Sequence, residues 1–266
     1  MCLGRSNFPH ERSGISTHRE TKIEGNRAKL VFEKSFARYS QLGLSKPIDK
    51  ANAILGIEFR LATFYDTSSV YGVFQCHFGI SLLWKRTKDE VVPIPFLNQE
   101  VPTWSWMAYE NPIDYVRVSA DFTQYPEFHF DYRDIDGSRI NRSLLDVQLQ
   151  KITLGGPSRK QEHSWTFVQD GSDNRIGAIS ADQEKELGPG LEVVRIRGGR
   201  GCRRDYGGSP EETASEKVEY VIIVAPSSSD NGSNSGVNSS PLYRRLGVGV
   251  FQHGLIEPAG KKALII

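Results

Sequence analysis

The stretch "VPTWSWMAYENPIDYV", residues 101–116, marks the point at which the hydrophobic pattern of the chain changes. Two of the four tryptophans, Trp104 and Trp106, stand here between Pro102 and Pro112. Before this stretch, hydrophobic residues recur at intervals of three and four, as they do on one face of a helix. After it they tend to alternate, as in a half-buried strand. The stretch therefore predicts a junction between a helical part and a β-rich part.

Residues 28–100 are expected to form a small layer of about three helices. The first helix begins near the start of this range, the second follows the capping residue Ser45, and the third runs from Ser68 or Ser69 to Trp84. The stripes expected to face the core are Phe32, Phe36 and Tyr39 in the first helix, Ile48, Ala51, Leu55, Glu58 and Leu61 in the second, and Tyr71, Phe74, Phe78 and Leu82 in the third.

Residues 101–266 read as the tryptophan junction followed by strands such as "LDVQLQKITL", "LEVVRIR" and "VEYVIIVAP". Without helical patterns between them, these strands predict an antiparallel sandwich or a partly open barrel, and hence an α+β protein. Two polar segments near 198–217 and 226–241 are expected to be flexible loops, and residues 1–27 a disordered tail.

The overall charge excludes a protein that attracts polyanions through its whole surface. The 266 residues carry 33 basic and 32 acidic side chains, a net charge of +1. The three cysteines are scattered, which argues against a disulfide framework or a zinc site. No apolar window is long enough to span a membrane, and the first residues lack the apolar core of a signal peptide. We therefore expect a cytoplasmic protein without a membrane partner.

The strand "EFHFD" is the most enzyme-like segment, because Glu127, His129 and Asp131 share one face of it. Two carboxylates beside an imidazole suit a metal ion or a proton relay, as in a small hydrolase or a metal-dependent enzyme. A half-buried strand with its polar face toward water gives the same pattern, and we favour that interpretation.

The densest basic segment, 195–204, raises a second alternative, an RNA-associated module. Its arginines are Arg195, Arg197, Arg200, Arg203 and Arg204, with Tyr206 as one ring that could stack on a base. A solvated loop explains this short run without a ligand, and we favour that interpretation, so nucleic acid is not an expected partner. The neighbouring pair Cys76 and His77 is interpreted as structural, with a buried thiol. The glycines of "RLGVGVFQHG" predict a bulged strand.

Several motifs in order resemble the region that follows the signalling domain in fungal heterokaryon-incompatibility (HET) domain proteins. The first motif comprises Tyr39, Ser40, Leu44, Ser45, Asp49, Ala53, Gly56 and Ile57; the second Leu82, Leu83 and Trp84; the third Pro102, Trp104, Ser105 and Trp106. "YRRLGVGVF" is similar to a late strand of the family. Thr103 and Met107 depart from the third motif.

The resemblance implies a non-catalytic accessory or recognition region of a HET-type protein of fungal non-self recognition, a process that ends in programmed cell death. The HET signalling domain is expected upstream, and only 27 unpatterned residues precede Ala28, which suggests a truncated paralogue or gene fragment. The expected partner is another protein, the incompatibility partner, and no cofactor or catalytic residue is implied. Trp104 and Trp106 are expected to point the same way and to be covered by the segment that ends at Trp84.

Overall fold

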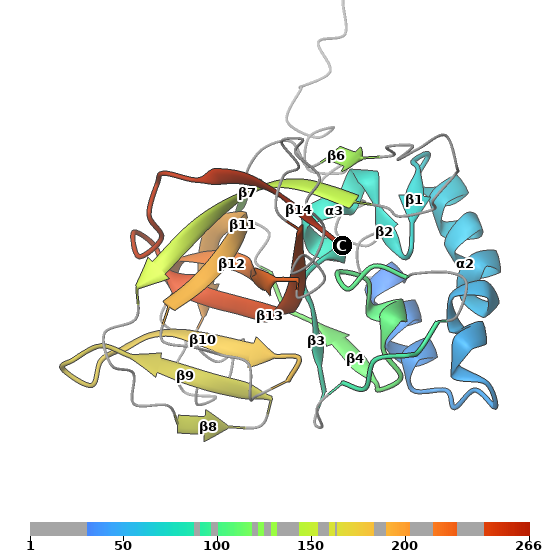
Figure 1. The fold of residues 1–266 in the computed structure, drawn as a ribbon, viewed down its shortest axis with the longest axis horizontal. Helices are drawn as coiled ribbons and strands as arrows, with labels where there is room; N and C mark the ends of the chain where they lie inside the picture. Colours follow the sequence, from blue (N-terminus) through green and yellow to red (C-terminus); the bar gives the residue numbers. More distant parts are fainter. Residues whose placement is uncertain are drawn as a thin grey trace, which may run out of the picture.

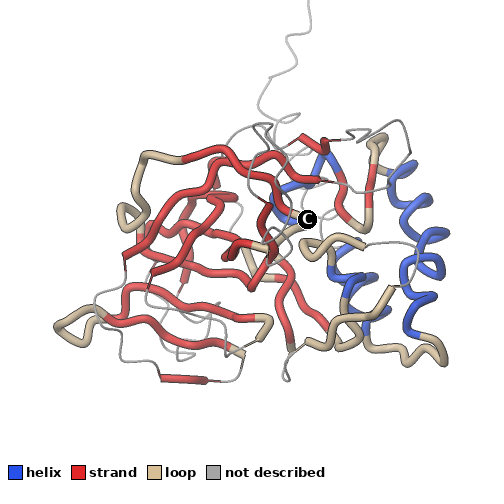
Figure 2. Tube along the Cα trace, viewed as in Figure 1, coloured by secondary structure: helices blue, strands red, loops and turns tan. Residues whose placement is uncertain are grey.

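The computed structural model describes residues 31–87, 91–96, 101–118, 122–124, 129–131, 144–153, 160–162, 164–183, 190–202, 215–227 and 242–266. The fold is α+β, as predicted: three N-terminal helices precede a β-rich region that contains a closed five-stranded barrel (Figure 1). Most of the helical residues lie at one end of the molecule, and most of the strands lie toward the other (Figure 2).

The first helix covers 31–40, and a short 3₁₀ turn, η1 (Pro47–Asp49), leads into α2 (Lys50–Phe64). Pro47 occupies the first turn, but the predicted cap Ser45 lies outside it, and Lys46 precedes the turn without a side-chain cap. The expected stripe of α2 is partly wrong. Ala51, Ile54, Glu58 and Leu61 are buried, whereas Ile48 and Leu55 are exposed.

The predicted third helix is largely a hairpin. Its segment forms β1 (Ser69–Val70), β2 (Val73–Phe74), a 3₁₀ turn η2 (Gln75–His77), the single turn α3 (Phe78–Ser81) and β3 (Trp84–Arg86). Tyr71 and Gly72 have φ angles of 47° and 78°, and this left-handed backbone breaks a helix. The backbone N–H of Gly72 donates a hydrogen bond of 3.0 Å to Oε1 of Glu58 on α2, which ties the hairpin to the helix.

The barrel consists of β7 (Leu144–Thr153), β11 (Gly190–Cys202), β12 (Ser215–Pro226), β13 (Leu242–Gln252) and β14 (Lys261–Ile265). The strand order is β12-β11-β7-β14-β13, and the pairing of β12 with β13 closes the ring. The ring is not fully antiparallel, because β13 and β14 run parallel. On β13 the sheet continues through β10 (Arg175–Ala181), β9 (Trp165–Gln169) and β8 (Lys160–Glu162), while β5 (Phe122–Gln124) pairs with β11 and β6 (His129–Asp131) with β7.

A bulge in β13 confirms the bulged strand predicted from its glycines. The pairing with β12 skips Leu246, since Ile223 pairs with Gly247 and Val224 with Arg245. A bulge shifts the alternation of side chains by one residue. Gly247 has a φ of 153°, and a Cβ there would lie 2.4 Å from the carbonyl oxygen of Ser180, so β13 approaches β10 closely at this point.

The predicted loop at 198–217 is shorter than expected. Residues 198–202 belong to β11 and 215–217 to β12, which pair with each other. The rest of that loop, most of the loop at 226–241 and the tail at 1–27 lie outside the described residues.

Candidate functional site

The tryptophan segment lies between the helical layer and the barrel, and its two indoles are fully buried. They do not point into one surface as expected. Trp104 packs in the hydrophobic cluster to which all five barrel strands contribute, together with Leu82 and Leu83. Trp106 packs in the cluster of the helical layer, where its ring centroid lies 5.3 Å from that of Phe36.

The indoles diverge because the segment turns instead of staying extended: the N–H of Ser105 donates to the carbonyl oxygen of Pro102 at 2.9 Å, and a helical turn follows. Trp106 begins a short 3₁₀ helix, η3 (Trp106–Ala108), and Oγ of Ser105 caps it by accepting from the N–H of Met107 at 3.1 Å. The same hydroxyl donates to the carbonyl oxygen of Tyr71 at 2.8 Å. Ser105 therefore fastens the tryptophan segment to the β1–β2 hairpin.

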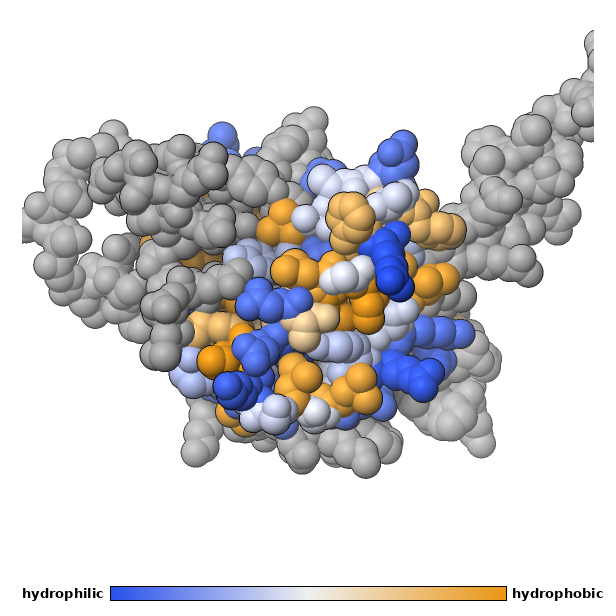
Figure 3. Space-filling model, turned by 90° about the vertical axis from the view of Figure 1, so that its right-hand side faces the viewer, coloured by the Kyte–Doolittle hydropathy of each residue, from blue (hydrophilic) through white to orange (hydrophobic). Residues whose placement is uncertain are grey.

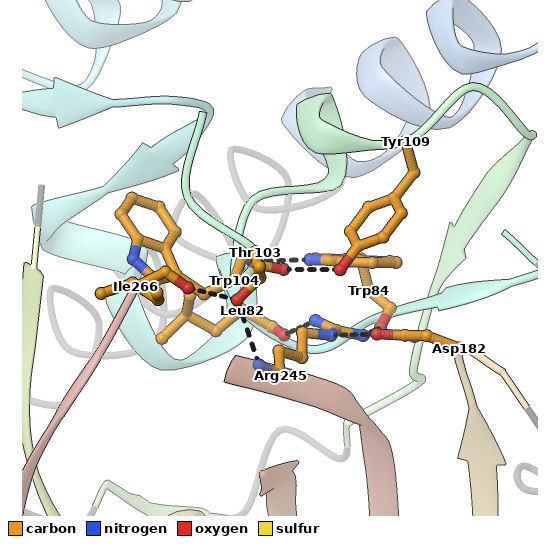
Figure 4. A network of polar contacts seen from close by, with 8 residues as sticks. All are labelled: Leu82, Trp84, Thr103, Trp104, Tyr109, Asp182, Arg245 and Ile266. Atoms are coloured by element: carbon orange, nitrogen blue, oxygen red, sulfur yellow. Dashed lines mark hydrogen bonds and ion pairs between the residues drawn. The ribbon is translucent and has the colours of Figure 1, made fainter. Parts of the chain in front are cut away.

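A buried arginine of the barrel, paired with an aspartate, binds the backbone at the start of β3 (Figure 4). Nε of Arg245, on β13, donates to Oδ2 of Asp182 at 3.0 Å, and both residues are almost fully buried. The guanidinium also donates to the carbonyl oxygens of Leu82 at 3.0 Å and Trp84 at 2.6 Å. These partners compensate the charge of Arg245 inside the protein, so the group is suited to holding two layers together.

Thr103 completes the network on the other side of Arg245. Its Oγ1 accepts from the backbone N–H of Arg245 at 3.1 Å and donates to the backbone oxygen of Ile266. Its carbonyl oxygen accepts from the hydroxyl of Tyr109 at 3.3 Å. The Thr103 hydroxyl thus bridges β13 and the residue that follows β14.

A pocket of about 190 Å³ opens beside this network. Its apolar wall includes Ile94, Phe96, Val101 and Tyr109, and its polar wall includes Thr103, Asp182, Gln183, Arg244 and Arg245. Asp182 and Arg245 already bind each other there. A carboxylate held by an arginine is a poor general base, because the ion pair favours its charged form. The pocket thus offers shape and a few polar contacts rather than an obvious acid–base pair.

The enzyme-like strand is only partly described. His129 and Asp131 lie in β6, which pairs with β7, and Glu127 falls outside the described residues. Within the described ranges, no group of three or more His, Cys, Asp or Glu side chains is placed to hold a metal ion. The Cys76 thiol, expected to be buried, is exposed in η2, because the predicted helix is absent there.

The arginine segment is not a solvated loop where it is described. Arg195, Arg197 and Arg200 lie in β11. Arg197 is buried, and burial lowers the pKa of its guanidinium to about 10. Arg195 forms an ion pair with Glu219 of β12. Arg203, Arg204 and Tyr206 lie outside the described residues.

The most distinctive surface feature is the solvent side of α2. We call Leu55, Ile57, Phe59 and Phe64 the α2 face; they are 55%, 38%, 74% and 68% exposed. Seven of the eight large hydrophobic residues exposed in the described part of the chain fall between 31 and 64; only Val92 lies elsewhere. Figure 3 looks onto this side of the molecule and shows hydrophobic residues at its surface. Such clustering is typical of a surface that binds another molecule.

Buried charges on the opposite side of α2 explain how this helix is held. The ammonium of Lys50 donates to the carbonyl oxygen of Tyr109 and lies 5.0 Å from the centroid of the Trp106 ring. Desolvation lowers the pKa of Lys50 to about 8. Burial likewise raises the pKa of Glu58, whose carboxylate accepts from Gly72. Two charged residues thus face the core while four large apolar residues face solvent.

Sequence reasoning identified part of this site. It placed the tryptophans at a buried junction, but it missed Arg245, Asp182 and Lys50, whose partners are distant in the chain. The sequence did contain a signal for the α2 face, because α2 has only three charged residues, Lys50, Glu58 and Arg60, among its 15 residues. Of these, Arg60 alone is exposed in the structure. A helix that is apolar on all sides is expected to be covered on all sides.

Comparison with known proteins leaves the family open: no family model, no curated protein and no solved structure matches the chain. Among the described residues, no helix is long and apolar enough to cross a membrane.

Proposed function

We propose that this chain is a non-catalytic recognition region of a HET-type fungal non-self recognition protein, and that it binds a protein partner through the α2 face. The exposure of four large apolar side chains on one short helix carries the proposal. Burying an exposed Phe or Leu side chain stabilises a complex by roughly 1.5 to 3 kcal/mol, so a partner gains much from covering this face. The ordered motifs that resemble HET-type proteins supply the biological context.

The positions of the arginines favour a protein-binding role over the alternative role in RNA binding. An RNA module needs arginines that reach phosphate groups. Arg197 is buried between the barrel and α3, and Arg195 is engaged by Glu219. Two of the five arginines of the basic segment therefore make contacts within the protein instead of facing a nucleic acid.

The proposal is tested in fungal cells that fuse and then undergo incompatibility. The fraction of fused cells that die is measured with the 266-residue chain, without it, and with a variant that carries Phe59→Asp and Phe64→Asp. We expect the intact chain to change this fraction and the variant to behave as if the chain were missing, because two charges on the α2 face oppose burial.

Ser172→Asp is the matched control, since Ser172 is exposed in the turn between β9 and β10, far from α2 (Figure 1). This control should behave like the intact chain. A double variant that is folded and still acts like the intact chain would contradict the proposal. An intact chain without any effect on the fused cells would contradict it as well.

A further inference from the structure

The charges that border the α2 face follow an alternating order along the chain. Lys46 and Asp49 stand at the start of α2, and Arg60 and Asp66 stand near its end. All four side chains are exposed, and within the described part of the chain none of them has an ion-pair partner. Their signs run positive, negative, positive, negative.

This order is self-complementary in one arrangement only. When such a helix lies antiparallel to a copy of itself, the order of the copy is reversed, and the nearest charge across the interface from each of the four has the other sign. Lys46 then faces Asp66 of the other copy, and Asp49 lies at the end that carries Arg60. A parallel arrangement would bring like charges together, which costs free energy at an interface.

The middle of α2 allows a close approach. Gly56 lies midway in sequence between Lys46 and Asp66, it is exposed, and a Cβ added there would meet nothing within 4 Å. At about 100° per residue, Gly56 is on the side opposite the buried residues. The low surface at Gly56 is flanked by Phe59 on one side and Phe64 on the other, so two helices can pack with their aromatic residues beside the crossing point.

We propose that the α2 face binds the α2 face of a second copy of this chain, with the two helices antiparallel across a twofold axis near Gly56. Such an interface uses the same patch on both subunits, as twofold dimers require. In this register Phe64 lies opposite Ile48 of the other copy, and Arg60 lies opposite Asn52. The inference rests on the proposed function, because it names the partner of the same surface.

A pair of substitutions at one exposed position tests this register. Asn52→Glu places a carboxylate opposite Arg60 of the other copy, and Asn52→Lys places an ammonium there. Within one helix these positions are two turns apart, so they do not form the contacts of residues three or four apart. By sedimentation of the 266-residue chain over a range of concentrations, we expect the dimer Kd to fall about fivefold for Asn52→Glu and to rise about fivefold for Asn52→Lys.

A compensating change makes the test specific. Arg60→Glu added to Asn52→Lys restores opposite charges across the interface and should return the Kd toward that of the intact chain. Ser172→Glu and Ser172→Lys carry the same charge changes on the β9–β10 turn and should leave the Kd unchanged. Melting curves confirm that each variant is folded.

Three outcomes overturn the inference. The chain is monomeric at all concentrations, or it forms a dimer whose Kd is the same for both Asn52 variants. In the third outcome the full chain is monomeric, and it dimerises only after residues 1–27 are removed. In the last case the N-terminal segment is the occupant of the α2 face. A monomeric chain whose Phe59→Asp and Phe64→Asp variant loses its effect in fused cells would leave the proposed function standing with a different protein as the partner. A dimer that follows the expected series, without any effect in cells, would instead overturn the proposed function alone.

Discussion

The guanidinium carbon of Arg245 lies 3.3 Å from the centroid of the Trp84 ring, and the same guanidinium donates to the carbonyl oxygen of Trp84. One barrel residue thus holds both the ring and the backbone of the residue that begins β3. The guanidinium therefore makes three kinds of buried contact: an ion pair with Asp182, a cation–π contact with the Trp84 ring, and a hydrogen bond to the Trp84 backbone. This relationship fixes how the helical layer sits on the barrel.

Replacing Arg245 should be strongly destabilising. Arg245→Met leaves the Asp182 carboxylate buried without its partner, and breaking a buried pair in this way costs about 3 to 5 kcal/mol. Chemical denaturation measures the loss. Arg244→Met is the neighbouring control, since that residue is partly exposed, and we expect a cost below about 1 kcal/mol.

The unpaired carboxylate can be separated from the lost packing by a second variant. Arg245→Met combined with Asp182→Leu leaves no buried charge, so it should recover part of the stability lost in Arg245→Met alone. If the double variant is less stable than the single one by the full cost of a second deletion, the pair does not act as a unit.

Truncation of either tryptophan of the junction should cost about 3 to 5 kcal/mol, but in different parts of the molecule. Trp104→Ala removes a side chain from the barrel cluster, and Trp106→Ala removes one from the helical cluster. Hydrogen exchange should therefore quicken mainly in β11 and β12 for the first variant, and mainly in α2 for the second. Equal loss of protection in the same elements would contradict the division into two clusters.

The lowered pKa of Lys50 should make its contribution to the free energy of unfolding increase between about pH 8 and pH 10.5. Desolvation lowers its pKa in the folded protein from 10.5 to about 8. The folded state therefore disfavours the ammonium, and this penalty is present in full below pH 8. It is relieved as the pH rises from about 8 toward 10.5, where the unfolded chain also loses the proton. Denaturation of the intact protein between these pH values measures the gain.

Lys50→Met isolates this effect, because tyrosines titrate in the same range. Burial raises the pKa of Tyr65 to about 12, so its unfolded form ionises first and stability falls as the pH passes about 10. The difference in stability between the intact chain and Lys50→Met cancels that contribution. A difference that does not change between pH 8 and 10 would show that Lys50 keeps an ordinary pKa.

Gly247 is expected to tolerate no side chain. Its φ of 153° and the Ser180 oxygen, 2.4 Å from the position of a Cβ, leave Gly247→Ala without a place for the methyl group. We expect a loss of about 3 kcal/mol. Gly171→Ala is the control, since a Cβ meets nothing within 4 Å there. Equal melting temperatures for the two variants would contradict this account of the bulge.

The local signals in the sequence predicted the order of the fold well. The change of period near Trp104 marks the start of the β-rich part, although β1, β2 and β3 precede it, and the apolar patterns of β11 and β12 were readable without a structure. Barrel closure was not, because the pairing of β12 with β13 and the parallel pairing of β14 depend on contacts between distant segments. Hydrophobic alternation looks the same in a sandwich and in a barrel.

Two errors have local physical causes. The third helix was expected because Phe74, Phe78 and Leu82 are spaced as in a helix, and all three are indeed buried. The left-handed turn at Tyr71 and Gly72 overrides this spacing. In α2, apolar residues occur on every side, so periodicity did not show whether Ile54 or Leu55 faces the core.

The buried polar junction was the least predictable feature. Arg245 and Asp182 are 63 residues apart, and neither has a sequence neighbour that signals an ion pair. The motifs that resemble HET-type proteins include Trp104 and Trp106. Thr103 differs from the third of these motifs, so the resemblance did not point to the contact of its hydroxyl with β13. Side chains that join distant strands leave no periodic signal.

The central claim, that the α2 face binds protein, is tested most directly by a photo-crosslinking amino acid placed at position 59 of the 266-residue chain in fungal cells. Phe59 is 74% exposed, so the probe disturbs no core contact, and position 172 carries the same probe as a control. We predict that light yields a protein adduct at position 59 and none at position 172. Mass spectrometry of the adduct then shows whether the partner is a second copy. A folded, expressed chain that forms no protein adduct at position 59, or forms equal adducts at both positions, would contradict the claim.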